Sequence, residues 1–229
     1  MTEHKSDYVT ERTTDLVTIV DPRSPISEAY RTLRTNLDFA SLDQALKTIA
    51  VTSAGVGEGK STTLSNLAVV SAQAGRKVIL VDADLRRPTL HQIFGLNNEA
   101  GLTTMIMDEA AFQTPPLQAT GIEGLSVLTS GPQPPNPAEL LGSRRMAEVI
   151  AALAEWGDQI FFDTPPVVAV TDAAVLATKV DGVLLIISAG KTRREYAQTA
   201  VQRLEQINAR LVGTVLTNVQ AGGGFTGYY

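Results

Sequence analysis

Residues 51–63 read VTSAGVGEGKSTT, a β-rich run that enters a glycine-rich turn and continues into a helical stretch. In that order, the backbone N–H groups of the turn and the positive end of the helix converge where phosphate groups bind. We expect Lys60 to hold the β- and γ-phosphates of a nucleotide and Ser61 to reach Mg²⁺. Ala54 stands where the strict motif has glycine, but the strand–loop–helix order is intact and argues against a chance glycine-rich turn. The predicted nucleotide-binding residues are Gly55, Val56, Gly57, Glu58, Gly59, Lys60, Ser61 and Thr62.

Short β-rich runs alternate with helical stretches from Lys47 onward. Several runs are almost continuous Val, Ile and Leu, which is typical of strands buried on both faces. The alternation predicts an α/β fold in a single domain, with a mostly parallel central sheet and helices on both faces. The runs are residues 47–53, 77–83, 125–130, 159–165, 182–188 and 211–218; helices are predicted around 61–74, 137–155, 171–179 and 192–208, and a loop over 114–121.

Capping residues predict where two helices begin. In SPISEAYRTLRTNLDFAS the apolar residues recur every three or four positions, which indicates an amphipathic helix with Ser24 or Ser27 as its cap. Farther along, Asn136, Pro137 and Glu139 match a cap, a first-turn proline and a capping-box acid.

The two ends of the chain differ from the predicted domain. Residues 1–25 are polar and end in prolines, so we interpret them as a flexible arm. The P-loop-type domain is expected over 26–218, and residues 219–229 are a glycine-rich tail that ends in Tyr228 and Tyr229. If the last strand is parallel to the others, the tail leaves the sheet at the nucleotide edge. About ten extended residues span at most ~35 Å, enough to cross a subunit boundary.

The composition excludes several classes of protein. The chain has 229 residues, 44% of them apolar, which suffices for a full-sized core. Its net charge of -5 argues against a general nucleic-acid binder, because such proteins carry a basic face. Cysteine is absent, which excludes disulfides, thiolate metal sites and iron–sulfur clusters. The polar start is unlike a secretory signal and the longest apolar run is far too short for a membrane span, so we expect a cytoplasmic chain.

Aspartates end two of the predicted strands. Asp82 and Asp84 close VILVDAD, and Asp163 closes QIFFD. The carboxyl ends of parallel strands form the edge of an open α/β sheet at which ligands bind. Mg²⁺ takes few protein carboxylates and fills its shell with phosphate and water, so this cluster suits a metal–nucleotide site, although a lone aspartate is more often a cap or turn residue. Arg86 and Arg87 either screen this charge, contact phosphate or are solvated.

Several motifs together resemble one protein family. The runs SAGVGEGKST, ILVDADLRR and IFFDTPP, with PPNPAELL between the last two, are similar to the bacterial tyrosine kinases of polysaccharide export, often called BY-kinases. The resemblance covers the chain from about Ser24 to its end. Related ATPases that position cell-division or plasmid-partition machinery carry a signature lysine five residues before the main one. That position is Gly55 here, which favours the kinase branch.

The resemblance implies ATP and Mg²⁺ as cofactors and assigns roles to the site residues. It places Lys60 and Ser61 at ATP and Mg²⁺. It assigns Asp84 and Asp163 to Mg²⁺, directly or through water, and Asp82 to activating the acceptor hydroxyl. A tyrosine hydroxyl, with a pKa near ~10, benefits from a carboxylate that accepts its proton during phosphoryl transfer. Spacing alone does not decide which of Asp82 and Asp84 is the base, so that assignment comes from the family.

The resemblance also implies roles for two further motifs. Asn218 follows the last predicted strand, where related ATPases place an asparagine that hydrogen-bonds adenine; an ordinary turn asparagine is the alternative. Glu28, Arg31 and Arg34 form E-x-x-R-x-x-R on the first predicted helix. An exposed Glu28–Arg31 pair would explain the spacing by itself. In BY-kinases, however, this motif mediates ring-shaped self-association, so we expect an oligomer interface.

The sequence therefore predicts an ATP-dependent protein-tyrosine kinase that phosphorylates Tyr228 and Tyr229 in trans and regulates exopolysaccharide or capsule synthesis and export. The implied partners are an integral-membrane activator and chain-length regulator, expected as a separate chain that recruits the kinase to the membrane, and an opposing phosphotyrosine phosphatase. Family tails usually carry more tyrosines, so we expect either a small phosphorylation capacity or a shortened chain. A switch ATPase and a non-catalytic ATP-binding regulatory subunit are the alternatives, because both would share Lys60 and the aspartates.

Overall fold

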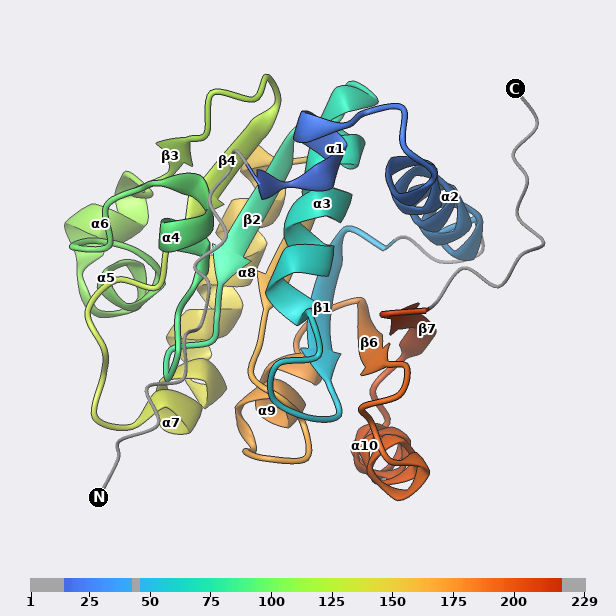
Figure 1. Cartoon of the computed structure of the whole chain (residues 1–229). Helices are drawn as coiled ribbons and strands as arrows, with labels where there is room; N and C mark the ends of the chain where they lie inside the picture. The colour runs from blue at the N-terminus through green and yellow to red at the C-terminus, as the bar shows by residue number, and fades with distance from the viewer. Residues whose placement is uncertain (1–14, 43–45, 220–229) are drawn as a thin grey trace, which may run out of the picture.

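The computed structural model describes residues 15–42 and 46–219. Within these residues, the centre is a seven-stranded sheet in the order β3-β4-β2-β5-β1-β6-β7 (Figure 1). All neighbouring strands are parallel except β3 and β4, which confirms the predicted α/β class. The strands are β1 (Thr48–Ser53), β2 (Val78–Asp82), β3 (Gln118–Ala119), β4 (Leu125–Leu128), β5 (Gln159–Asp163), β6 (Gly182–Ser188) and β7 (Leu211–Thr217).

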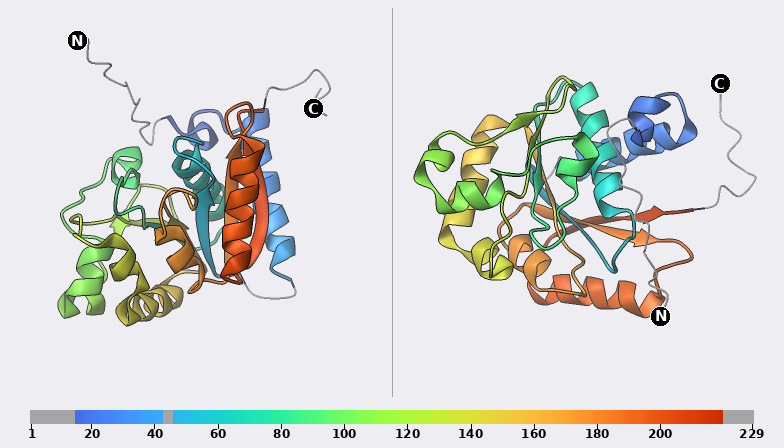
Figure 2. Two further views of the ribbon diagram at one scale, coloured as in Figure 1. Left: turned by 90° about the horizontal axis from the view of Figure 1, so that it is seen from below. Right: turned by 60° about the vertical axis from the view of Figure 1, so that its left-hand side comes forward.

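Helices cover both faces of this sheet, and α6 and α10 lie at its opposite ends (Figure 2). One core cluster joins the sheet to α1–α4, and the other joins it to α5 and α7–α10. Ile160 and Phe162 of β5 belong to the second cluster, whereas Phe161 between them belongs to the first, because strand side chains alternate between faces. The helices are α1 (Val17–Val20), α2 (Pro25–Ala40), α3 (Lys60–Gln73), α4 (Leu90–Phe94), α5 (Leu102–Met107), α6 (Glu109–Gln113), α7 (Pro137–Gly142), α8 (Arg144–Trp156), α9 (Asp172–Ala177) and α10 (Arg194–Gln206).

The carboxyl ends of the strands meet at one edge of the sheet. β5 lies between β1 and β2, and Asp82 pairs in register with Asp163. β1 ends at Ser53, from which the chain turns into the glycine-rich loop and α3. β7 is parallel to β6 and therefore ends at the same edge. The parallel direction on which the tail argument depends is confirmed.

The prediction of a flexible arm is wrong for residues 15–25, because this segment contains α1 and the start of α2. Leu16 is fully buried, and α1 packs against α3. The backbone N–H and the hydroxyl of Thr18 both donate to Asn66 Oδ1, at 3.1 and 2.8 Å. These contacts hold the segment against α3 despite the polar composition on which the prediction of an arm rested. Residues 1–14 lie outside the described residues.

The helix ends also refine the predictions. Ser24, rather than Ser27, caps α2, since its hydroxyl accepts from Ser27 N at 3.1 Å. The helix predicted over 137–155 is broken at Ser143, whose side chain caps α8. Asn136 precedes α7 as predicted, but its amide donates to the Glu139 carboxylate instead of capping the backbone.

The loop predicted over 114–121 contains the short strand β3, which pairs antiparallel with β4. A strand of two residues is too short to show the alternation by which strands are predicted. Among the described residues, no helix has both the length and the apolar composition that a bilayer crossing requires.

Candidate active site

The glycine-rich loop joins β1 to the amino end of α3. Gly57 and Gly59 have φ values of 70° and 81°, in the left-handed region that favours glycine. Gly59 is the N-cap of α3 and offers no side-chain hydrogen bond. The first N–H groups of α3 therefore have no side-chain cap, which leaves them available for an anionic ligand. This is the geometry that the motif predicted.

Lys60 and Ser61 point to the carboxylate that ends β5. Lys60 Nζ forms a buried ion pair with Asp163 Oδ1, and Ser61 Oγ donates to Asp163 Oδ2 at 2.5 Å. Lys60 Nζ also lies 3.2 Å from Ser61 Oγ and 3.9 Å from Asp84 Oδ2. The structure thus brings the predicted loop residues and two of the predicted carboxylates together, while their catalytic roles stay predictions.

Asp82, like Asp163, is fully buried at this edge. Its Oδ2 accepts from Thr89 N and Leu90 N at 3.0 and 2.9 Å, whereas Oδ1 has no hydrogen-bond partner among the described residues. Burial raises the pKa of Asp82 well above its ordinary value, and the neighbouring charge of Asp163 raises it further. Asp82 is therefore a carboxylate with one oxygen free to accept a proton.

Asp84 has a different environment. Burial raises its pKa, but Lys60 opposes that shift, and Asp84 Oδ1 accepts from Arg87 N at 3.0 Å. Ser61, Asp84 and Asp163 supply only oxygen donors, which is the ligand type that Mg²⁺ prefers. Within the described part of the chain, no three His, Cys, Asp or Glu side chains are placed to hold a metal by themselves.

The comparisons with known proteins agree with this geometry. A ParA-type family described as "NUBPL iron-transfer P-loop NTPase" matches residues 44–221. The tyrosine-protein kinase YwqD of Bacillus subtilis (strain 168) is 47% identical over 202 residues, which cover 88% of this chain and 85% of YwqD. The chain belongs to the bacterial tyrosine kinases. It is thus an ATP-binding P-loop kinase, and the iron transfer of the matched description has no thiolate ligand here, since the chain contains no cysteine.

Two solved structures extend the likeness of this bacterial tyrosine kinase to the whole fold. The kinase domain of the Escherichia coli tyrosine kinase ETK has a TM-score of 0.86 at 35% identity, covering 93% of this chain and 83% of that one. The chimerical protein CapA2B2 has a TM-score of 0.84 at 39% identity, covering 90% of each chain. The predicted family, fold and enzyme class are confirmed.

Three side chains from distant parts of the chain contact the phosphate loop of the kinase, and the sequence alone does not predict these contacts. Thr192, in the loop between β6 and α10, donates from Oγ1 to Glu58 Oε1 at 2.5 Å. Lys191 Nζ donates to the Gly57 carbonyl at 2.6 Å, and Thr217 Oγ1 donates to the Glu58 carbonyl at 2.9 Å. Because Thr192 and Glu58 are 134 positions apart, no local pattern predicts these bonds.

Arg86 has a structural partner that the sequence analysis missed. Its guanidinium donates from Nε and Nη2 to the two carboxylate oxygens of buried Asp172, at 2.8 and 3.0 Å. This bidentate pair ties the segment after β2 to the start of α9. Arg86 therefore has a positioning role that the sequence did not predict, and its side chain is also 42% exposed.

Asn218 directly follows β7 at the same edge, in a left-handed conformation with a φ of 55°. Its amide donates to Ser188 Oγ at 2.8 Å. That conformation is typical of asparagine in a turn. The adenine contact stays a prediction.

The E-x-x-R-x-x-R residues lie on α2. Arg31 donates to Glu28 at 3.0 Å and to the Pro22 carbonyl at 2.7 Å, while Arg34 donates to the Val70 carbonyl of α3 at 3.1 Å. Both arginines therefore have structural contacts within one chain, and Glu28, with a side chain 62% exposed, is the most accessible of the three. The tail tyrosines Tyr228 and Tyr229 lie outside the described residues.

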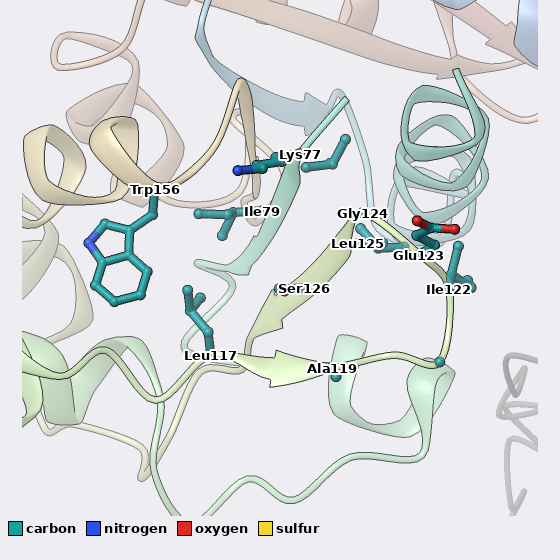
Figure 3. Close-up of a pocket in the computed structure, with 12 residues that line it drawn as sticks. Lys77, Ile79, Leu117, Ala119, Ile122, Glu123, Gly124, Leu125, Ser126 and Trp156 are labelled. Carbon is teal, nitrogen blue, oxygen red and sulfur yellow. The ribbon is translucent and has the colours of Figure 1, made fainter. Parts of the chain in front are cut away.

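A hollow of about 510 Å³ lies at the other edge of the sheet (Figure 3). It is bounded by the starts of β2 and β4, with Leu117 and the 56% exposed Trp156 at its side. No part of the phosphate loop lines it. The edge at which the carboxyl ends of the strands meet, here called the catalytic edge, is instead lined by backbone and charged groups.

Proposed function

We propose that this kinase phosphorylates the tyrosines of its own tail, Tyr228 and Tyr229, with the phosphoryl group passing from one copy to the tail of another. The supporting observation is where the tail begins. β7 is parallel to β6, and its last residue, Thr217, donates to the Glu58 carbonyl of the phosphate loop. The chain that leads to the tyrosines therefore starts beside the active site, and about ten extended residues span up to ~35 Å.

The chemistry follows from the positions of the charged groups. Lys60 neutralises phosphate charge, and Asp82, with Oδ1 unpaired, accepts the proton of the tyrosine hydroxyl as that oxygen attacks the γ-phosphorus. Ser61, Asp84 and Asp163 would hold Mg²⁺. The ion, when bound, neutralises charge that develops on the phosphate oxygens. In the described structure Lys60 pairs with Asp163, and its ammonium group has further N–H donors for phosphate oxygens.

Self-association brings a tail to a neighbouring site. We assign Glu28, Arg31 and Arg34 to an interface between copies arranged in a ring, as the family resemblance implies. The exposed Glu28 carboxylate offers an acceptor to a neighbouring chain. The intramolecular bonds of the two arginines fix the direction of α2, which would set the angle between subunits.

A membrane partner completes the proposed function. The similar chimerical protein is named CapA2B2, and the similar Staphylococcus aureus protein CapB is a putative tyrosine-protein kinase. We extend the family's partnership to this chain, with a membrane protein that activates the kinase, recruits it to the cytoplasmic face and controls capsule or exopolysaccharide chain length. A phosphotyrosine phosphatase would reverse the modification.

Transfer between copies has a direct test. Mix a Lys60→Met copy that keeps its tail with a copy that carries Tyr228→Phe and Tyr229→Phe, add ATP and Mg²⁺, and sequence the phosphopeptides. We expect phosphotyrosine on the tail of the Lys60→Met copy only in the mixture. An unlabelled tail there, alongside a labelled wild-type control, would rule out transfer between copies.

A further inference from the structure

Tyr196 is an accessible tyrosine at the catalytic edge of the kinase. It lies in the first turn of α10 and is 52% exposed. Tyr30, the other tyrosine in the described residues, packs partly buried against a core cluster. Of these two hydroxyl groups, Tyr196 is the one that a second protein molecule can approach.

The segment before Tyr196 touches the phosphate loop. β6 ends at the catalytic edge, and the loop that follows places Lys191 on the Gly57 carbonyl and Thr192 on the Glu58 carboxylate. Tyr196 follows Thr192 by four residues. A phosphoryl group on Tyr196 would thus be introduced next to the segment that holds the phosphate loop.

The surroundings of Tyr196 suit a phosphorylated side chain. Arg193 and Arg194 precede it, and neither makes an ion pair with a described residue. The segment 190–200 contains one acidic residue, Glu195, and three basic residues, Lys191, Arg193 and Arg194. The added charge also lies near the amino end of a helix, where negative charge is stabilising.

The first turn of α10 has no side-chain cap. Its N-cap residue, Arg193, gives no side-chain hydrogen bond, so the turn lacks the cap that stabilises most helix starts. An uncapped first turn opens more easily than the interior of a helix. Such opening would let Tyr196 enter a catalytic site in an extended conformation.

We propose that Tyr196 is a second phosphoacceptor, phosphorylated by another copy of the kinase. The inference rests on the proposed self-phosphorylation between copies. The Tyr196 hydroxyl oxygen bonds to the γ-phosphorus of ATP, the bond from that phosphorus to the β–γ bridging oxygen breaks, and ADP leaves. The hydroxyl proton passes to Asp82 of the copy that carries the ATP.

Trypsin separates the candidate sites. Cleavage after Arg194 and Arg203 yields residues 195–203, in which Tyr196 is the sole tyrosine, and cleavage after Arg210 yields residues 211–229 with both tail tyrosines. The experiment incubates the full chain with ATP and Mg²⁺ and measures phosphate on both peptides. Lys60→Met serves as the inactive control, and Tyr196→Phe and the double tail variant Tyr228→Phe/Tyr229→Phe assign the label.

We expect phosphotyrosine on residues 195–203 of the wild type and of the double tail variant. It should be absent from Tyr196→Phe, and from Lys60→Met when that variant is incubated by itself. An isotopically heavy Lys60→Met copy should gain it when mixed with the light double tail variant. Label on residues 211–229 with none on 195–203 overturns this proposal and leaves the proposed function standing. Absence of label from both peptides contradicts both proposals.

Discussion

At the residue scale, Asp82 and Asp84 differ in ways that their spacing does not show. A buried carboxylate with an unpaired oxygen is costly, and Asp82 is such a group, whereas Asp84 contacts Lys60 and the Arg87 N–H. The sequence predicted that both lie at the nucleotide edge but could not rank them. Their partners, which come from the segment after β2 and from α3, favour Asp82 as the base.

Asp82→Asn should lower kcat for tyrosine phosphorylation by about 10²–10⁴-fold, because the amide cannot accept the hydroxyl proton. ATP binding should stay close to that of the wild type, since Oδ1 of Asp82 has no partner among the described residues. Steady-state kinetics and equilibrium binding of ATP measure the two effects. A variant with wild-type kcat would remove Asp82 from the base role.

The pKa of Asp82 also predicts how stability depends on pH. Burial raises this pKa in the folded chain above the ordinary value of 3.8, so the folded state binds the proton more tightly than the unfolded state. The ionised Asp82 therefore destabilises the fold above the raised pKa, and the penalty disappears as the pH falls toward 3.8.

In Mg²⁺-free buffer, Asp82→Asn should be more stable than the wild type at pH 7, and the difference should shrink as the pH is lowered. Denaturant unfolding at several pH values measures it. A difference that is constant with pH, or a less stable variant at pH 7, would contradict the assigned cause.

At the element scale, α1 belongs to the folded domain. Leu16→Ala should lower the free energy of unfolding by about 2–5 kcal/mol, as expected for a fully buried leucine. Leu42→Ala is the matched control, since Leu42 is 78% exposed and should change stability by less than about 0.5 kcal/mol. Equal effects in the two variants would show that the segment is the flexible arm predicted from composition.

The elements divide by length into those that the sequence predicts and those that it does not. Buried strands such as β2 and β6 have nearly continuous apolar runs, so their positions were predicted closely. α1 and β3 have four and two residues, too few for a period to show. The Ser143 break is local, because Ser143 Oγ accepts from Met146 N, so a capping serine directly after Gly142 is the signal that the prediction missed. The Thr192–Glu58 bond joins residues 134 positions apart, which local sequence does not encode.

At the scale of the whole molecule, the proposed transfer between copies requires self-association, because a tail must meet the active site of another copy. Glu28→Ala should shift the assembled species toward monomer in sedimentation velocity. The stability of the monomer should change by no more than about 1 kcal/mol, because an exposed ion pair contributes little. Arg34→Ala is a less specific variant, since it also removes the bond to Val70. An unchanged assembly in Glu28→Ala would remove Glu28 from the proposed interface.

The central claim is that the Lys60 site transfers the γ-phosphoryl group of ATP to tyrosines of this chain. Incubation of the purified chain with γ-labelled ATP and Mg²⁺, followed by phosphoamino-acid analysis, tests it most directly. The account predicts label on tyrosine, none in Lys60→Met, and a strong decrease when the tail tyrosines are replaced by phenylalanine. Steady phosphate release without labelled protein would contradict it and would indicate a switch ATPase.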